Sequence, residues 1–349
     1  MKVLLIGGTW NLTGGKKSGL IEKMYQKLTK EKDFDIDYFN GGYYEDLKNL
    51  VNSSKNYKII FWMANVPNEL EKVRDIKNVN PLAIVIGSKR NHYNEYSFVD
   101  ILNKALLQRN NLTIEFSKNN NNSNFKMLLF DPLGTSWYEG YDLDELIKNL
   151  ISRIRFLLTV NRERTYSNPQ LNNVIEDIDF FDYVREVAEI FHKTIQHSEG
   201  VTRFLGNASY RKNNQIFVTE RDIDKRLLNK NHIVECYLDK NKTFYYGNKK
   251  PSKDTVVQIK LYNILLNINY IVHSHCYVKN APFTNIPIPC GALEEIDEIL
   301  EVIKNNYNND FTKEYYAINL KGHGCIIFGN NLELLKQTKF KTRYLPEKL

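Results

Sequence analysis

Two histidines one residue apart, His273 and His275, follow a short apolar run at residues 270–272. In a strand, alternate side chains share a face, so both imidazoles would point the same way. A third histidine, His323, stands between two glycines just before another apolar run, where the backbone can approach closely. Three neutral imidazoles that leave a fourth position open are typical of a catalytic zinc site rather than a closed structural one. The pattern predicts a site for Zn²⁺ or another divalent transition metal.

Each half of this pattern has a plainer interpretation. A His-x-His pair on its own is weak evidence for a metal, and an isolated histidine such as His323 is more often a turn residue or a hydrogen-bonded core residue. Cys325 lies two residues beyond His323 and could face the same side, although a buried cysteine is usually a small core residue. The metal hypothesis therefore depends on what surrounds the histidines.

Composition limits the classes of protein that fit. A length of 349 residues with 42% hydrophobic residues favours two ordinary globular domains. The net charge of +7 is spread along the chain, without a basic block interleaved with aromatic residues, so nucleic-acid binding is not indicated. A lysine-rich solvated surface accounts for the charge, and an anionic substrate such as a sugar phosphate is also compatible with it.

Cysteine usage and the first residues indicate the compartment. None of the four cysteines forms a CxxC pair, which favours reduced thiols in a cytoplasmic protein over a disulfide scaffold. The apolar run near residue 1 is too short for a signal peptide or a membrane span. We expect it to be a buried first strand and expect no membrane segment.

Short apolar runs alternate with helix-like stretches from residue 1 to about 160. This alternation predicts a parallel sheet with crossover helices, a Rossmann/flavodoxin-like α/β domain. A polar connector at 161–178 precedes a second α/β domain at 179–349. The expected strands of the first domain are 3–6, 58–63, 82–87 and 125–130, and the expected helices are 20–28 and 142–158.

A glycine-rich loop that begins with Gly7, Gly8 and Thr9 follows the first expected strand and precedes the first expected helix. Such a position suits a phosphate, because backbone N–H groups and the helix N-terminus attract anions. The spacing matches neither the G-x-G-x-x-G nor the G-x-x-x-x-G-K-[ST] pattern, and a plain tight turn is the alternative. A nucleotide-binding or sugar-nucleotide-binding role for the first domain is a hypothesis.

Four motifs between about residues 180 and 340 occur in an order that resembles the class II aldolase and adducin head-domain family. The first resembles its glycine-asparagine substrate loop, the second its acidic segment, and the last two its paired and single metal ligands. In this sequence the motifs read Gly206-Asn207-Ala208-Ser209 with Arg211, Lys250-Pro251-Ser252-Lys253-Asp254-Thr255, His273-Ser274-His275 and Gly322-His323-Gly324. The resemblance implies an α/β/α fold for the second domain.

The resemblance also implies a chemistry. Zinc held by the three histidines would stabilise an enediolate during reversible aldol cleavage or condensation of a sugar-like hydroxy-carbonyl substrate. Asp254 would act as the acid/base residue, although it also stands where a helix N-cap is expected. Family aldolases carry glutamate at this position and family epimerases carry aspartate, so Asp254 raises the epimerase alternative. The implied substrate-binding residues are Gly206, Asn207, Ser209, Arg211 and Ser252.

One segment departs from the family pattern. Members that act on sugar phosphates often have a Thr-Pro-x-Gly-like loop that holds the phosphate, and here the corresponding residues 219–222 read Thr-Glu-Arg-Asp. A phosphate would be poorly received there unless Arg221 compensates. The family usually forms tetramers, so we expect a homo-oligomer, in which Tyr344 could donate a proton at a neighbour's site. The remaining alternatives are a sugar-phosphate dehydratase and a non-catalytic, adducin-like interaction module.

Overall fold

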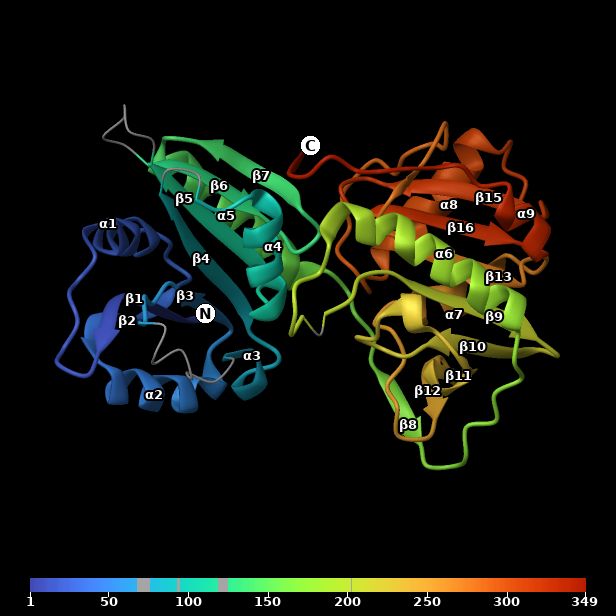
Figure 1. Cartoon of the computed structure of the whole chain (residues 1–349), viewed down its shortest axis with the longest axis horizontal. Coiled ribbons are helices and arrows are strands. Elements are labelled where there is room, and N and C mark those ends of the chain that lie inside the picture. The colour runs from blue at the N-terminus through green and yellow to red at the C-terminus, as the bar shows by residue number, and fades with distance from the viewer. Residues whose placement is uncertain (68–75, 93–94, 119–124, 202) are drawn as a thin grey trace. The chain divides into compact units, whose positions relative to one another are not determined.

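The computed structural model describes residues 1–67, 76–92, 95–118, 125–201 and 203–349 (Figure 1). The chain forms two compact units. Unit 1 contains residues 1–158 together with 345–349, and unit 2 contains residues 159–344. No described helix has the length and apolar character needed to cross a membrane.

Unit 1 is built on an eight-stranded sheet in the order β18-β7-β6-β5-β4-β3-β1-β2. Neighbouring strands from β2 to β5 are all parallel, in the order 2-1-3-4-5 that is typical of flavodoxin-like sheets. The strands are β1 (Lys2–Asn11), β2 (Asp35–Tyr43), β3 (Ile59–Trp62), β4 (Ile84–His92), β5 (Leu112–Lys118), β6 (Lys126–Phe130), β7 (Thr135–Gly140) and β18 (Glu347–Lys348). The helices are α1 (Gly19–Leu28), α2 (Tyr44–Ser53), α3 (Ile76–Val79), α4 (Phe98–Leu107) and α5 (Leu143–Thr159).

The parallel Rossmann/flavodoxin-like core is therefore confirmed, and the edge beyond β5 differs from the expectation. Strand β6 runs antiparallel to both of its neighbours, β5 and β7, whereas the edge strand β18 pairs with β7 in parallel. The chain between β5 and β6 spans only residues 119–125, and a parallel crossover needs a dozen residues or more. A connection of that length between β5 and β6 allows only an antiparallel pairing.

The glycine segment at the end of the first strand also differs from the expected open loop. Strand β1 continues to Asn11, with an irregularity in its pairing to β2 between Gly7 and Trp10. The Thr9 N–H donates to the Lys16 carbonyl oxygen at 2.8 Å, and helix α1 begins only at Gly19. The Thr9 amide is thus already used, and the segment Gly7–Thr9 does not lead directly into a helix N-terminus as a phosphate loop would.

Unit 2 is built on a second eight-stranded sheet, in the order β15-β16-β13-β9-β10-β11-β12-β8. All neighbours are antiparallel except β12 and β8. Its strands are β8 (Thr165–Asn168), β9 (Asn207–Lys212), β10 (Gln215–Thr219), β11 (Ile233–Asp239), β12 (Lys242–Tyr246), β13 (Tyr270–Ser274), β15 (Tyr315–Leu320) and β16 (Gly324–Gly329). A separate pair joins β14 (Tyr277–Val278) to β17 (Phe340–Lys341). The helices include α6 (Ile178–Ile195), α7 (Thr255–Ile264), α8 (Glu294–Asn306) and α9 (Leu332–Lys336), and a short 3-10 helix, η3, spans Lys225–Leu227.

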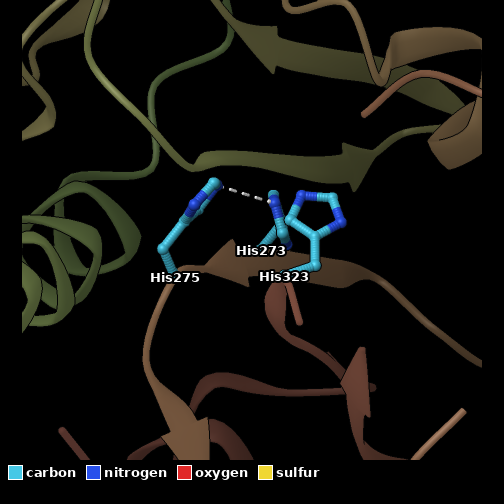
Figure 2. Close-up of side chains that lie close together, drawn as sticks. All are labelled: His273, His275 and His323. Carbon is cyan, nitrogen blue, oxygen red and sulfur yellow. Dashed lines mark hydrogen bonds between the residues drawn. The ribbon is translucent and has the colours of Figure 1, made fainter. Parts of the chain in front are cut away.

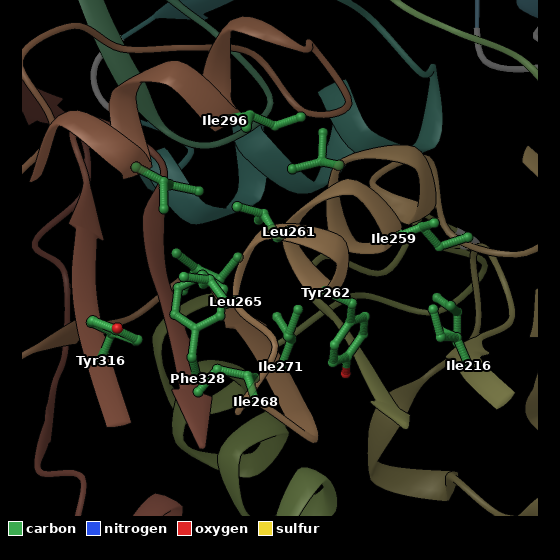
Figure 3. Packing of buried hydrophobic residues seen from close by; sticks show 14 of the residues in the cluster. Ile216, Ile259, Leu261, Tyr262, Leu265, Ile268, Ile271, Ile296, Tyr316 and Phe328 are labelled. Carbon is green, nitrogen blue, oxygen red and sulfur yellow. The ribbon is translucent and has the colours of Figure 1, made fainter. Parts of the chain in front are cut away.

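Helices cover both faces of this sheet, which gives the expected α/β/α arrangement. Ile271 packs with side chains of α7 and α8 in one buried cluster (Figure 3), and the next residue, Val272, packs with side chains of α6 in another. Because neighbouring strand residues point to opposite faces, a strand buried on both sides must be apolar throughout. Asn207, the first residue of β9, lies opposite His273 near the end of β13, and its side chain contacts Asp254 at the start of α7.

The boundaries of the two units differ slightly from those expected from the sequence. Residues 165–168, expected in a connector, form strand β8 at the edge of the sheet of unit 2. Residues 345–349, expected in the second domain, belong to unit 1, where β18 pairs with β7. Two-residue and four-residue edge strands have too little hydrophobic pattern to be recognised from sequence.

Gly324 should tolerate no side chain. Its φ is +148°, and a Cβ there would stand 2.1 Å from the Ser274 carbonyl oxygen and 2.6 Å from the His275 Cα. We expect Gly324→Ala to lower the free energy of unfolding by at least about 2 kcal/mol, because the overlap involves backbone that cannot rotate away. Denaturant unfolding measures this, and Gly19→Ala, whose Cβ would meet nothing within 4 Å, serves as control. Equal stability of the two variants would contradict the close approach.

Candidate metal centre

Three buried histidines converge at one end of the unit 2 sheet (Figure 2). His273 is on β13, His275 lies in the bend directly after it, and His323 lies in the turn before β16. The Nε2 atoms of His273 and His275 are 3.1 Å apart, and one ring nitrogen of each histidine lies within 4.8 Å of the others. Two nitrogens held by one tetrahedral zinc stand about 3.4 Å apart. No other group of three histidine, cysteine or acidic residues is this close within the described ranges.

The expected geometry of the His-x-His pair needs one correction. Strand β13 ends at Ser274, so His273 and His275 do not share a face of one regular strand. The bend after Ser274 instead swings the His275 ring back toward His273. The two rings converge as expected, but by a turn of the backbone rather than by strand alternation.

The surroundings of His273 fit a metal ligand. Its Nδ1 lies 2.9 Å from the Cys325 carbonyl oxygen, so Nδ1–H donates and the Nε2 lone pair points toward His275. Burial, reinforced by the charge of His323, lowers the pKa of His273 to about 4, and burial and His273 also lower the pKa of His275. Neutral imidazole is the form that binds a metal ion. His273 and His275 therefore fit a divalent transition metal, and a metal ion bound by all three histidines would displace any proton from the third, His323.

Two side chains that sequence reasoning did not find hold His323. The Glu295 Oε2, buried on α8, lies 3.5 Å from His323 Nδ1. The Arg343 Nη1 donates to the His323 carbonyl oxygen at 2.8 Å, and its guanidinium lies over the Tyr277 ring. Although burial opposes it, contacts with Cys290 and Glu295 raise the pKa of His323 well above its usual value. A carboxylate behind a histidine is a common orienting partner for a metal ligand.

Cys290 and Cys325 take different places around the histidines. Cys290 Sγ lies 3.2 Å from His323 Nε2. Cys325 is fully buried among apolar residues on the α6 face and contributes only its carbonyl oxygen to the group. Its expected role as a small core residue is the one that the packing supports.

Asp254 lies at the N-cap position of α7, but its side chain makes no capping hydrogen bond. Instead the Asn207 Nδ2 donates to Asp254 Oδ2, and the Gln258 Nε2 donates to Asn207 Oδ1. Asp254 is 7% exposed, and its second oxygen, Oδ1, has no hydrogen-bond partner among the described residues. The chain of amides thus fixes one carboxylate oxygen and leaves the other available. Gln258 gave no signal in the sequence, because an amide at helical spacing from an aspartate is common.

The other site residues expected from the sequence divide into two groups. Gly206, with φ +83°, brings its backbone close to the His273 carbonyl oxygen, and the Ser252 Oγ accepts from the Asp254 N–H, so both shape the site. Ser209 is fully buried with its Oγ 3.1 Å from the Tyr262 hydroxyl. Tyr344 is 91% exposed. Neither of these two contacts the histidines within one chain.

The structure does not place Arg211 where a substrate-binding residue was expected. It lies four residues along β9 from Asn207, and its guanidinium donates to the carbonyl oxygens of Tyr262, Leu266 and Ile268. Those carbonyls belong to the C-terminal end of α7 and the turn after it. Arg211 thus closes the end of α7 opposite to Asp254 and does not contact the site.

Glu295→Gln should weaken metal binding without unfolding the protein. The amide keeps the size of the side chain but removes the carboxylate that lies 3.5 Å from His323 Nδ1. We expect the affinity for Zn²⁺ to fall by roughly 10- to 100-fold, the usual effect of losing such a partner. Competition with a chromogenic chelator measures it. Glu301→Gln, exposed on the same helix, should leave the affinity unchanged, and equal affinities in both variants would contradict an orienting role for Glu295.

Part of the chain matches a known protein family. Residues 185–338 match the family model described as class II aldolase and adducin N-terminal domain. Solved structures with some likeness include an L-fuculose 1-phosphate aldolase (16% identity, 46% of this chain and 79% of that chain, TM-score 0.33) and the L-fuculose-1-phosphate aldolase of Thermus thermophilus (18%, 44% and 81%, 0.31). A third is the DNA/pantothenate metabolism flavoprotein of Streptococcus pneumoniae (14%, 46% and 99%, 0.35).

These structural likenesses are weak, and none of the curated proteins matches this sequence. The family match rests on the sequence of unit 2 and contains the histidines, Asp254 and Asn207, whereas unit 1 is not assigned to a family. Within unit 2, residues 185–338 match the class II aldolase and adducin N-terminal domain family.

Proposed function

We propose that unit 2 is a metal-dependent lyase that reversibly cleaves or joins a sugar-like hydroxy-carbonyl substrate by aldol chemistry. The observation that carries this proposal is the pairing of three converging, buried imidazoles with a buried carboxylate, Asp254, whose free oxygen has no partner in the described chain. A divalent ion bound by these histidines would act as a Lewis acid toward the substrate's oxygen atoms.

The protein's own residues have distinct tasks in this reaction. Asn207 holds Asp254 Oδ2, so Oδ1 is presented in one orientation and can take a proton from the substrate or return it. Gln258 fixes the Asn207 amide in turn, so the donor of Asn207 cannot rotate away. The burial of Asp254 and of the histidines excludes water, which strengthens the electrostatic interactions with developing negative charge.

Two alternatives use the same residues. Epimerisation and dehydration of a sugar phosphate also begin by moving a proton or an electron pair beside a carbonyl, and an aspartate at position 254 suits the epimerases of the family. The Nε of Arg221 is buried without a partner in the described chain, beside the segment that replaces the usual phosphate loop. This free donor supports Arg221 as a substitute contact for a phosphate. Product analysis distinguishes the three reactions.

A non-catalytic, adducin-like interaction module is the alternative of a different class. Such a module needs no metal. The orienting contacts of His273 with the Cys325 carbonyl oxygen and of His323 with Glu295 favour a metal centre over it, because a mere core histidine needs no buried carboxylate behind it.

The proposal extends to the whole protein in three respects. All four cysteines are free thiols, which supports a cytoplasmic location. Tyr344 is exposed at the end of unit 2, where it is available to a neighbouring copy in a homo-oligomer. A ligand for unit 1, such as a nucleotide or sugar nucleotide, stays a hypothesis, since the Thr9 amide is engaged within the chain.

Removal of one histidine should abolish metal binding. We expect the purified protein to contain about one zinc per chain and His275→Ala to contain almost none, because two imidazoles bind zinc far more weakly than three. Elemental analysis measures both, and His232→Ala, outside the group, should keep its metal. If the protein stays free of metal after zinc is supplied, the lyase proposal is rejected and the non-catalytic, adducin-like module becomes the preferred function.

Asp254→Asn should separate chemistry from binding. The amide preserves the shape of the side chain but cannot take up a proton, so we expect the turnover number to fall by roughly 10²- to 10⁴-fold with zinc content unchanged. A coupled assay for aldehyde release from hydroxy-carbonyl substrates measures turnover. Asp239→Asn, exposed at the end of β11, is the control. A variant that keeps wild-type turnover would remove Asp254 from the reaction.

A further inference from the structure

A cavity lies between α6 and the end of β13, beside His273 and His275, and its lining includes Asn207, which donates to the Asp254 carboxylate. Helix α6, the segment 204–207, η3 and the end of β13 form its walls. Phe191, at a ring-centroid distance of 5.4 Å from His275, and Val187 give it an apolar floor. Since Asn207, His273 and His275 also line it, the cavity opens onto the proposed metal centre.

The cavity contains a buried positive charge. Lys225 is only 6% exposed, and the one hydrogen bond of its ammonium to the described residues is a long contact of 3.5 Å to the Phe204 carbonyl oxygen. An ammonium has three donors, and burying them without acceptors is costly. Burial lowers the pKa of Lys225 to about 8, while Asp222, Asp254 and Asp224 oppose that shift. None of these carboxylates forms an ion pair with Lys225 in the described part of the chain.

The other charges that line the cavity cancel each other. Arg226 donates from Nε and Nη2 to both carboxylate oxygens of Asp224, at 2.6–3.1 Å. Burial and His192 lower the pKa of His197 to about 4, so its imidazole is neutral at pH 7. With Asp224 neutralised by Arg226, the cavity carries the single positive charge of Lys225.

Two further polar atoms in the wall have no partner. The His192 Nδ1 and the His197 Nε2 are both buried and unbonded within the described residues, and their rings stack at a centroid distance of 6.1 Å. Both histidines line the cavity together with Lys225. A neutral imidazole offers one N–H donor and one acceptor, so this wall can complete the hydrogen bonds of a small polar group.

We propose that this cavity receives a carboxylate of the substrate, with Lys225 as its counter-ion and His192 and His197 as hydrogen-bonding partners. The cavity volume of about 30 Å³ limits the guest. A water molecule needs roughly 10–15 Å³ by this measure, so the cavity has room for a group of about two oxygen atoms. The inference rests on the proposed lyase and specifies its substrate as a hydroxy-carbonyl compound that ends in a carboxylate.

Calorimetric titration of the zinc-loaded protein tests the cavity directly, without turnover. The probes are glycolate, inorganic phosphate and uncharged ethylene glycol, and the proteins are the wild type, Lys225→Met and Lys212→Met. Lys212 is exposed at the end of β9 and controls for the loss of one positive charge. We expect glycolate to bind the wild type and Lys212→Met equally and Lys225→Met at least 10-fold more weakly. Ethylene glycol should bind all three alike.

Several outcomes would overturn the proposal. Equal glycolate affinity for the wild type and Lys225→Met would show that the carboxylate binds elsewhere, such as at the metal alone. If inorganic phosphate binds more tightly than glycolate and its binding depends on Lys225, the cavity is a phosphate site and not a carboxylate site. Loss of the fold is checked by thermal unfolding, and Lys225→Gln provides a second, polar variant. We expect neither variant to unfold at a lower temperature, because each removes a buried charge without a close partner.

The same samples separate this inference from the proposed lyase. Glycolate binding that depends on Lys225, without cleavage of any hydroxy-carbonyl compound, would support the carboxylate site and reject the lyase. Cleavage of uncharged hydroxyaldehydes, with glycolate binding independent of Lys225, would support the lyase and reject the carboxylate site.

Discussion

The antiparallel pairing of β13 with β16 is the interaction on which the site depends. It places Ser274 opposite Cys325 and so brings two histidines into contact with a third from a distant part of the sequence. Beyond that pair the two backbones converge until Gly324 leaves no space for a side chain beside Ser274 and His275. The same pairing presents the Cys325 carbonyl oxygen to His273 Nδ1. Register, close approach and imidazole orientation thus arise from one local arrangement of backbone.

The sequence predicts the parts of this arrangement whose signals are local or belong to a family motif. The hydrophobic alternation of unit 1 indicates the parallel core, and the four ordered motifs indicate the histidines, Asp254 and Asn207. Contacts from distant segments leave no such signal. Glu295 looks like one more acidic residue on the exposed side of a helix, and Arg343 looks like a surface charge near the end of the chain. Each has a role only because the fold buries it against His323.

Where a prediction from sequence differed from the structure, a nearer partner explains the difference. The guanidinium of Arg211 donates to carbonyl oxygens in the last turn of α7 and in the segment that follows it, where helical hydrogen bonding ends. The Asp254 carboxylate stands where a helix cap belongs, yet its hydrogen bond goes to Asn207. Helix termini always leave backbone groups to be satisfied, and a sequence does not state which nearby side chain will satisfy them. Tertiary contacts decide which side chain makes these hydrogen bonds.

The return of residues 345–349 to the sheet of unit 1 has a consequence for how the protein is connected. The chain leaves unit 1 after α5 and re-enters it at β18, so unit 2 is an insertion within unit 1 rather than a domain appended to it. Both ends of the insertion are tethered to one host, which closes unit 2 into a large covalent loop. Closing a long loop adds little entropic cost as its length grows, so an insert of domain size is tolerated. Two cuts, and not one, would be required to release it.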